Sequence, residues 1–402
     1  FFSSRRRHTR LLWVTGVLTC ALPIFVALAM LLLLLCACGQ TEEPQNSPEV
    51  QNTGEPVADE SEGFTIGFAN VFVGNTWRAQ YVADAEAMAE QLKAEGRLKE
   101  LIITDADNDV SKQITQINNM IDEGVDAIMI TPVSATSLGT VIERAQSEGI
   151  LVVIAGDPAA YEGTYFVGGD NESFAQLNID WLVNELGGKG NIVQLTGVEG
   201  NSADKIRVEI YESVLAEYPE INVLASAPAN WNATEAQSVM ATFLSTFDNI
   251  DGVLQQDVTA PGVLMAYENA GKTPGIMTGD STFGFLRSWA ESDTLNCVAY
   301  ATHPGQICDA LNVTMRLLEG YELDESVLVP NPLDENLVNT ILLEPPYIVT
   351  NEAQPDAPWM ARFKYAKSIS VDEAVALGEG MSDADTLDGW MSQEQIDSYF
   401  VK

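Results

Sequence analysis

Basic residues are scarce in this sequence of 402 residues. Twenty lysines and arginines stand against 58 aspartates and glutamates, which gives a formal net charge of −38. A chain of that charge repels a polyanion, so nucleic-acid binding is excluded. The acidity is typical of a solvated surface and by itself names no ligand.

Histidine, clustered cysteine and nucleotide-binding motifs are also missing. His8 and His303 are the only histidines, so neither a zinc site nor a Ser–His–Asp set is expected. No G-x-x-x-x-G-K-[ST] is present, and residues 67–74 lack G-x-G-x-x-G. Residues 187–190 read Gly-Gly-Lys-Gly but lie between a predicted helix and a predicted strand, the reverse of a phosphate loop. We expect no enzyme activity, no cofactor and no metal.

The first 38 residues are typical of an export leader. Four arginines between positions 5 and 10 precede an apolar run from Phe25 to Leu35. This run is shorter than the roughly 20 residues of a transmembrane span, although an uncleaved anchor stays open as an alternative. Residues 35–39 resemble a bacterial lipobox, with Ala37 before Cys38 as the lipidated cysteine; Cys36 fits less well because Leu35 would precede the cut. We predict an extracytoplasmic protein in the cell envelope, anchored to the membrane by lipid on Cys38.

The start of the chain is unusual. It opens with Phe1 rather than Met, and residues 1–24 resemble translated sequencing-adapter read-through rather than a native signal. On that interpretation the native N-terminus is missing, while the leucine-rich core and the lipobox remain. The export prediction holds on either interpretation.

A polar segment, residues 39–63, follows the lipobox. It is rich in Glu, Gln, Asn, Pro and Ser and cannot bury enough apolar surface to fold, so we predict a disordered tether. Beyond it the only cysteines are Cys297 and Cys308. An even pair in an oxidising compartment favours a disulfide, with two separately buried thiols as the alternative.

Strand-like and helical patterns alternate from Phe64 onwards. The predicted strands are apolar without alternation, which indicates burial on both faces, and connections of this length favour parallel sheets with right-handed crossovers. The pattern restarts after residue 169. Residues 126–157 and 251–280 then follow the same order of strand, loop, helix, strand and Gly-Asp. The fold class is therefore α/β, with two doubly wound parallel-sheet lobes joined by a multi-strand hinge.

The predicted boundaries follow from this duplication. The N-terminal lobe comprises residues 64–168 and about 303–330, and the C-terminal lobe residues 169–302 and about 331–345. The chain is predicted to cross between the lobes near Gly168, Thr302 and Pro330. Residues 346–402 form an extension that packs on the outside.

Polar and aromatic residues follow several predicted strands at their carboxyl ends, where doubly wound sheets bind ligands. These residues are Asn70, Asn75, Trp77, Asp157, Asp257 and Asp280. A carboxylate accepts hydrogen bonds from two adjacent hydroxyls, and a flat ring such as Trp77 or Trp231 packs against C–H groups, so the set fits a polyol. A single Asp at such a point is usually a turn or cap residue. The recurrence of Gly-Asp in both halves favours Asp157 and Asp280 as ligand contacts.

Longer motifs carry a family resemblance. They are Ile130-Thr131-Pro132-Val133-Ser134, Gly149-Ile150-Leu151-Val152-Val153, and Gly200-Asn201-Ser202-Ala203 with Arg207. Over about residues 64–343 the chain resembles the ribose-binding-like branch of type I periplasmic solute-binding proteins. The resemblance implies a monomer that closes two lobes around a small polar ligand, expected to be a monosaccharide, and delivers it to an ABC permease. A sensory protein that presents its bound ligand to a membrane receptor stays open, as do the identity of the ligand and the role of the extension.

The resemblance also implies roles for particular residues. It assigns ligand contacts to Asn75, Trp77, Asp157, Arg207, Trp231, Asp257 and Asp280. The chain departs from the family pattern where Pro158 replaces an arginine and where Thr302 stands near an expected glutamine. Arg78 either replaces the missing arginine or is a solvated helix residue. Asn70, Arg78 and Thr302 complete the candidates.

Overall fold

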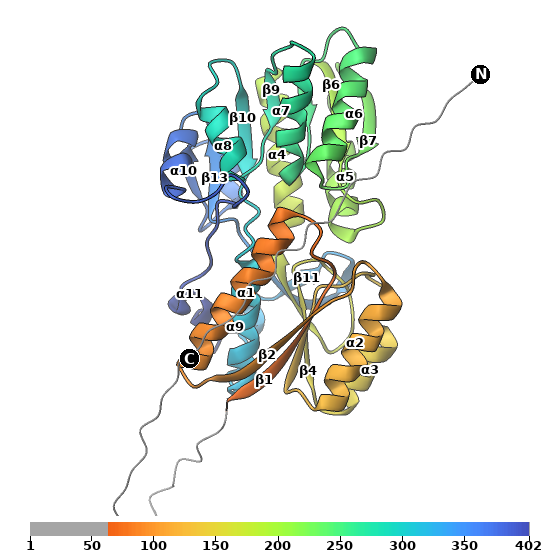
Figure 1. Cartoon of the computed structure of the whole chain (residues 1–402), viewed down its shortest axis with the longest axis vertical. Coiled ribbons are helices and arrows are strands. Elements are labelled where there is room, and N and C mark those ends of the chain that lie inside the picture. Colours follow the sequence, from red (N-terminus) through yellow and green to blue (C-terminus); the bar gives the residue numbers. More distant parts are fainter. Residues whose placement is uncertain (1–62, 402) are drawn as a thin grey trace, which may run out of the picture. The chain divides into compact units, whose positions relative to one another are not determined.

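A computed structural model describes residues 63–401. The leader, the lipobox with Cys38 and the predicted tether lie outside the described residues. The described part forms two lobes, each built on a seven-stranded, mostly parallel sheet (Figure 1). The strand orders are β11-β12-β5-β4-β3-β1-β2 and β14-β13-β10-β9-β8-β6-β7. The predicted α/β class with two doubly wound lobes is confirmed.

The first lobe is assembled from two stretches of chain. The first stretch contains β1 (Phe64–Asn70), α1 (Thr76–Ala94), β2 (Leu98–Asp105), α2 (Val110–Glu123), β3 (Ala127–Ile130), α3 (Gly139–Ser147), β4 (Leu151–Ala155) and β5 (Tyr165–Gly169). The second contains α9 (Gln306–Leu318), the 3-10 turn η2 (Glu325–Val327), β11 (Val329–Asn331) and β12 (Asp334–Leu343).

The second lobe is formed by the chain between β5 and α9 and by a further stretch after β12. Its first stretch contains α4 (Asn171–Glu185), β6 (Gly190–Thr196), α5 (Ser202–Leu215), β7 (Ile221–Pro228), α6 (Ala233–Thr246), β8 (Gly252–Leu254), η1 (Asp257–Thr259), α7 (Ala260–Asn269), β9 (Ile276–Thr278), α8 (Phe283–Ala290) and β10 (Asn296–Tyr300). Its second contains β13 (Tyr347–Thr350), η3 (Pro358–Arg362), β14 (Lys367–Ser370) and α10 (Val371–Leu377). The last helix, α11 (Gln393–Asp397), returns to pack on α9 of the first lobe.

The internal duplication has a structural counterpart. Asp126 precedes β3 and accepts a hydrogen bond from the backbone N–H of Thr65 in β1 at 2.7 Å. Asp251 precedes β8 and accepts one from the backbone N–H of Asn191 in β6, also at 2.7 Å. The two aspartates therefore tie corresponding strands together in the two lobes.

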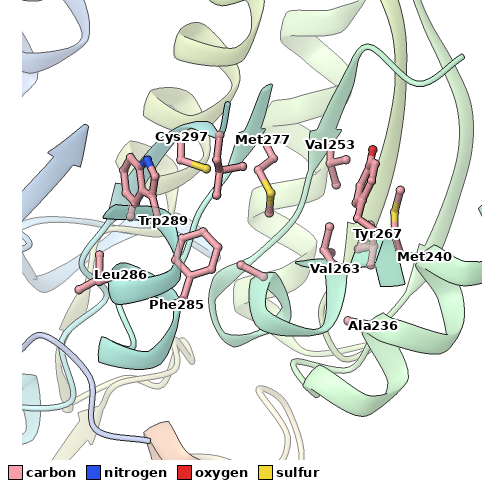
Figure 2. Close-up of a cluster of buried hydrophobic side chains, with 14 of the residues drawn as sticks. Ala236, Met240, Val253, Val263, Tyr267, Met277, Phe285, Leu286, Trp289 and Cys297 are labelled. Carbon is pink, nitrogen blue, oxygen red and sulfur yellow. The ribbon is translucent and has the colours of Figure 1, made fainter. Parts of the chain in front are cut away.

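Each lobe has its own apolar core. In the second lobe, Met277 and Val253 from the sheet meet Trp289 and Phe285 from α8 and Tyr267 from α7 (Figure 2). The strands lose contact with water on both faces, as the unbroken apolar runs predict. This burial makes each sheet a rigid base for the loops at its carboxyl edge.

Two predicted boundaries require correction. β12 joins the first sheet, parallel to β5, and not the C-terminal lobe. β13 and β14 belong to the second sheet, with β13 antiparallel to β10, so residues 346–370 are part of a lobe and not an outer extension. The apolar pattern of a strand reports burial but does not say which sheet edge it joins.

The crossings between lobes are also partly corrected. The chain crosses after β5, between β10 and α9, and between β12 and β13. The first two agree with the crossings expected near Gly168 and Thr302. Pro330 instead lies in β11, paired antiparallel with β12, so the third crossing falls at residues 344–346.

The predicted disulfide is wrong. Cys297 lies in β10 within the core of the second lobe, and Cys308 lies in α9 within the core of the first. Both are free thiols, and burial raises the pKa of each well above its usual range. Sequence spacing could not reveal that the two cysteines belong to different cores.

Among residues 63–401, no helix combines the length and the apolarity needed to span a bilayer.

Candidate functional site

A cavity lies between the lobes and takes its lining from both. The first lobe contributes Phe72, Asn75, Trp77, Arg78, Gly156 and Asp157, and the crossings contribute Gly169, Asp170, Thr302 and Gln306. The second lobe contributes Asn171, Phe174, Ala203, Arg207, Trp231, Asp257, Val258 and Tyr300. The cavity is therefore bounded by the carboxyl edges of both sheets.

The first turn of α1 positions the cavity-lining residues of the first lobe. Asn75 caps the helix, and its side-chain oxygen accepts a hydrogen bond from the backbone N–H of Arg78 at 2.8 Å. Trp77 stacks on Tyr81 with ring centroids 5.1 Å apart, and its indole N–H donates to the carbonyl oxygen of Thr302 at 2.5 Å. The cap and the indole bond fix this turn of helix against the second crossing.

Arg78 is buried, with 6% of its surface exposed, and it is not a solvated helix residue. Its Nη2 donates to Asp157 at 2.7 Å, and its guanidinium lies 5.0 Å from the ring centroid of Trp77. Its Nη1 has no hydrogen-bond partner among the described residues. A buried donor without a partner is costly, so this nitrogen marks a place where a ligand oxygen would be stabilised.

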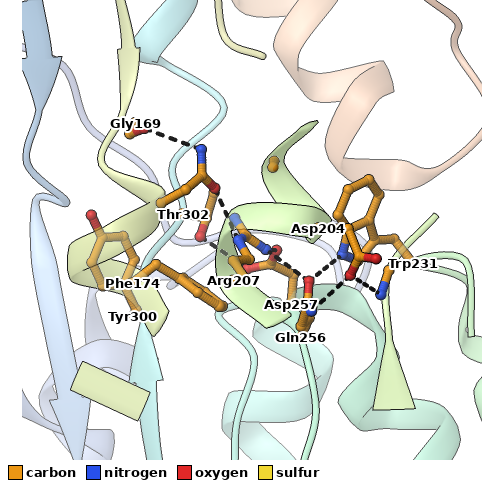
Figure 3. Close-up of polar contacts among 12 residues, drawn as sticks. Gly169, Phe174, Asp204, Arg207, Trp231, Gln256, Asp257, Tyr300 and Thr302 are labelled. Atoms are coloured by element: carbon orange, nitrogen blue, oxygen red, sulfur yellow. Dashed lines mark hydrogen bonds and ion pairs between the residues drawn. The ribbon is translucent and has the colours of Figure 1, made fainter. Parts of the chain in front are cut away.

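Arg207 on α5 is the corresponding group of the second lobe. Its guanidinium forms an ion pair with Asp257 and donates through Nε to Asn171 at 2.9 Å (Figure 3). It lies 3.7 Å from the ring centroid of Phe174. Burial lowers the pKa of Arg207, but the nearby Asp257, together with Tyr211 and Asp204, more than offsets that effect, so the pKa is raised. Arg207 therefore keeps its positive charge at any physiological pH.

Hydrogen bonds from neighbouring polar side chains surround the ion pair of Arg207 and Asp257. Gln256 accepts a hydrogen bond from the indole N–H of Trp231 at 3.1 Å and donates to Asp204 at 2.9 Å (Figure 3). Thr302 donates to Asp257 at 2.9 Å. Bonds on several sides of Asp257 hold its carboxylate in one orientation.

The backbone at this wall is held in an uncommon conformation. Trp231 and Asp257 have φ angles of 48° and 49°, in the left-handed region that L residues seldom adopt. The indole of Trp231 lies so close to Gly197 that a Cβ there would come within 2.3 Å of the ring. Such strain is characteristic of binding and catalytic sites.

The lobes also touch each other directly beside the cavity. The side-chain amide of Asn201 donates to Asp157 at 3.4 Å, and the hydroxyl of Ser202 donates to the carbonyl oxygen of Pro158 at 2.9 Å. Asp157 thus contacts Arg78 in its own lobe and Asn201 in the other.

Two sequence candidates do not line the cavity. Asp280 is buried, and its carboxylate accepts hydrogen bonds from the backbone N–H of Ser281 and the hydroxyl of Thr282, both at 2.6 Å. Burial raises the pKa of Asp280 to about 6, an effect that the Thr282 bond partly opposes. Asn70 is fully buried and donates to the carbonyl oxygen of Phe72 at 3.0 Å. The other eight candidates lie in the lining.

Sequence reasoning missed Asp170, Asn171, Phe174 and Gln306. The first three begin α4, whose N-cap is Asp170, and a capping residue directly after Gly168-Gly169 was the available signal. Gln306 accepts a hydrogen bond from the backbone N–H of Gly169 at 2.8 Å and so joins two crossings. Within residues 63–401, no group of histidine, cysteine or acidic side chains is arranged to hold a metal ion.

Residues 66–322 match the family described as periplasmic binding protein domain, and the chain belongs to this family. The likeness to the ribose-binding-like branch of type I periplasmic binding proteins is confirmed. The chain is therefore a binding protein and not an enzyme.

Similar proteins include a xylitol-binding protein of Mycolicibacterium smegmatis, 36% identical over 60% of this chain and 64% of that relative. The ribose import binding protein RbsB of Bacillus subtilis is 28% identical over 62% of this chain and 78% of its own length. The match to the xylitol-binding protein spans less than two thirds of that protein's length. A solved ABC transporter solute binding protein from Thermobispora bispora is 25% identical, with a TM-score of 0.63 over 79% of this chain and 95% of that one.

Proposed function

We propose that this protein is an extracytoplasmic substrate-binding protein that encloses one small neutral polyhydroxylated ligand, a monosaccharide or a sugar alcohol, and delivers it to an ABC importer. The observation that carries the proposal is the cavity itself. Each lobe contributes one buried arginine–carboxylate pair, and aromatic rings complete the walls. The names of the relatives, which refer to xylitol and ribose, support the same ligand class.

The charge of the lining favours a neutral ligand. Arg78 is paired with Asp157 and Arg207 with Asp257, so neither cation is left to bind an anionic group. The remaining acidic residue, Asp170, accepts a hydrogen bond from the backbone N–H of Ser173 as a helix cap. A sugar phosphate or sugar acid would bring charge without a partner into a buried site, at a high cost.

Hydroxyl groups suit the hydrogen-bonding pattern of this lining. Carboxylates of Asp157 and Asp257 can accept from ligand hydroxyls, while the free Nη1 of Arg78 can donate to a ligand oxygen. The rings of Phe174 and Trp231 offer apolar faces to ligand C–H groups. Since donors and acceptors come from both lobes, ligand binding would favour the closed arrangement through contacts on either side.

A thermal-shift screen of the purified protein tests this proposal. The panel contains xylitol, D-ribose, L-arabinose and myo-inositol, with gluconate and ribose 5-phosphate as charged counterparts. A cognate ligand at 100 times its Kd adds about 2.7 kcal/mol to the free energy of unfolding, which raises Tm by several degrees. A shift with a neutral polyol alone supports the proposal. A shift with a charged member alone would overturn the ligand class.

The location and the partner follow from the same proposal. The leader would carry the chain across the membrane, and lipid on Cys38 would hold it as a monomer near its permease. Uptake of the identified ligand by vesicles that contain the permease separates transport from presentation to a membrane receptor, which would give binding without uptake.

A further inference from the structure

Residues 378–392, called the strap below, join α10 in the second lobe to α11 on the first. The strap is a fourth connection between the lobes, in addition to the three crossings after β5, between β10 and α9, and between β12 and β13 (Figure 1). At its second-lobe end the strap accepts hydrogen bonds from Phe283 and Gly284 through the carbonyl oxygens of Asp385 and Asp383, at 2.9 and 3.0 Å. Leu387 is buried in the second-lobe core. This end is firmly part of the second lobe.

The other end of the strap is attached to the first lobe. The carboxylate of Asp388 accepts from the backbone N–H of Gly305 at 2.9 Å, next to the start of α9, and the N–H of Met391 donates to Asp309 at 2.8 Å. Farther on, Ile396 and Phe400 are buried in the first-lobe core. Neither end can leave its lobe without exposing apolar surface.

Between these anchors, two neighbouring strap residues bind opposite lobes. The side chain of Gln80 on α1 accepts from the backbone N–H of Thr386 at 2.8 Å and donates to its carbonyl oxygen at 3.3 Å and to Asp388 at 3.0 Å. The next N–H, that of Leu387, donates to the carbonyl oxygen of Ser281 in the second lobe at 2.7 Å. Movement of α1 away from Ser281 must break one of these two sets of bonds.

A carboxyl pair lies at the same contact. Asp84 lies one turn beyond Gln80 on α1, close enough to Asp388 for the two carboxyl groups to interact. Burial, and then the nearby Asp388, raise the pKa of Asp84 to about 8. The other titratable groups around the pair are Cys308 and Asp309 of α9 and, beyond Asp309, His303.

We propose that the strap is a clasp that holds the two lobes closed through Gln80, and that the cavity opens only when this contact is released. The closed arrangement then receives a contribution that is independent of the ligand. A protein biased in this way binds its ligand more tightly, because a larger fraction of molecules is already competent to bind. The inference concerns the lobes themselves and does not depend on which ligand the cavity takes.

Hydrogen–deuterium exchange of the full chain without ligand tests the clasp, with Gln80→Ala as the variant. The matched control is Gln91→Ala on the same helix, because Gln91 is exposed and its side chain bonds, among residues 63–401, only to Glu95, at 3.0 Å. Loss of the Gln80 bonds should speed exchange about fivefold or more in the strap and in the segments that touch across the cavity, residues 157–160 and 201–203. The control should match the wild type. Faster exchange confined to the strap, or no change, would overturn the proposal.

A second variant, Asp84→Asn, tests whether protonation of Asp84 stabilises the docked strap. Because burial against the strap raises the pKa of Asp84, docking should take up a proton, and the strap's protection from exchange should fall as pH rises from 6 towards 8 in the wild type. An amide at position 84 cannot ionise and should keep the protection factors of residues 385–391 level over that interval. An equal fall in wild type and variant would refute the proton link, and a folded variant with an unprotected strap at every pH would refute the role of this contact.

Discussion

The buried carboxyl of Asp280 allows a quantitative test of the structure. Its side chain is 3% exposed, and burial raises its pKa from the usual 3.8 to about 6. Since one pKa unit corresponds to 1.36 kcal/mol, ionisation of Asp280 costs the folded protein about 3 kcal/mol relative to the unfolded chain. The folded form binds the proton more tightly than the unfolded chain does. Protonated Asp280 therefore stabilises the folded protein fully below pH 4, and this stabilisation is lost as pH rises through 6.

Asp280→Asn removes this titration while keeping an oxygen that accepts from Ser281. Between pH 4 and 7 the wild type should lose about 2 kcal/mol more of its free energy of unfolding than the variant does. Urea denaturation followed by tryptophan fluorescence at several pH values measures the difference. Asp293→Asn is the control, because it makes the same chemical change on an exposed side chain before β10. Parallel curves for wild type and Asp280→Asn would refute the reasoning.

Three further predictions concern the site and the anchor. Arg78→Ala should weaken ligand binding by about 2–3 kcal/mol, because Asp157 loses its buried cation, whereas Arg144→Ala, on α3 and outside the cavity lining, should leave affinity unchanged by calorimetry. Gly197→Ala should displace the indole of Trp231 and lower affinity at least tenfold in a protein with an unchanged circular dichroism spectrum; unaltered affinity would remove that ring from the site. Cys38→Ser should release the protein from the membrane fraction, and equal retention of the variant would contradict lipid anchoring.

Much of the fold could be predicted because burial leaves a local signature. The apolar runs of β3 and β4 and the repeated Asp126 and Asp251 indicate two similar sheets without any knowledge of contacts. The partner of β12 could not be predicted in this way. Its position between β11 and β5 depends on how the chain returns between the lobes, and that path leaves no periodic pattern in the sequence.

The candidate site was likewise predictable only in part from the sequence. Asp157 and Asp280 both follow a glycine at the end of a strand, and position alone makes them equivalent. The difference arises from side chains that meet only in the fold. Arg78 reaches Asp157, whereas Thr282, two residues farther along the chain, takes the carboxylate of Asp280. Gln306 was missed for a related reason, since its role depends on Gly169, 137 residues away in the sequence.

The interleaving of the two lobes constrains the order in which the molecule can be completed. A chain that emerges from its N-terminus first presents β1 to β5 long before β12, the strand that covers the free edge of β5. Until residues 334–343 arrive, that edge exposes unpaired backbone groups, the feature that promotes wrong pairing between chains. The second lobe from α4 to β10 must be synthesised in the meantime, so the sheet of the first lobe starts first but is completed only after most of the second lobe has emerged.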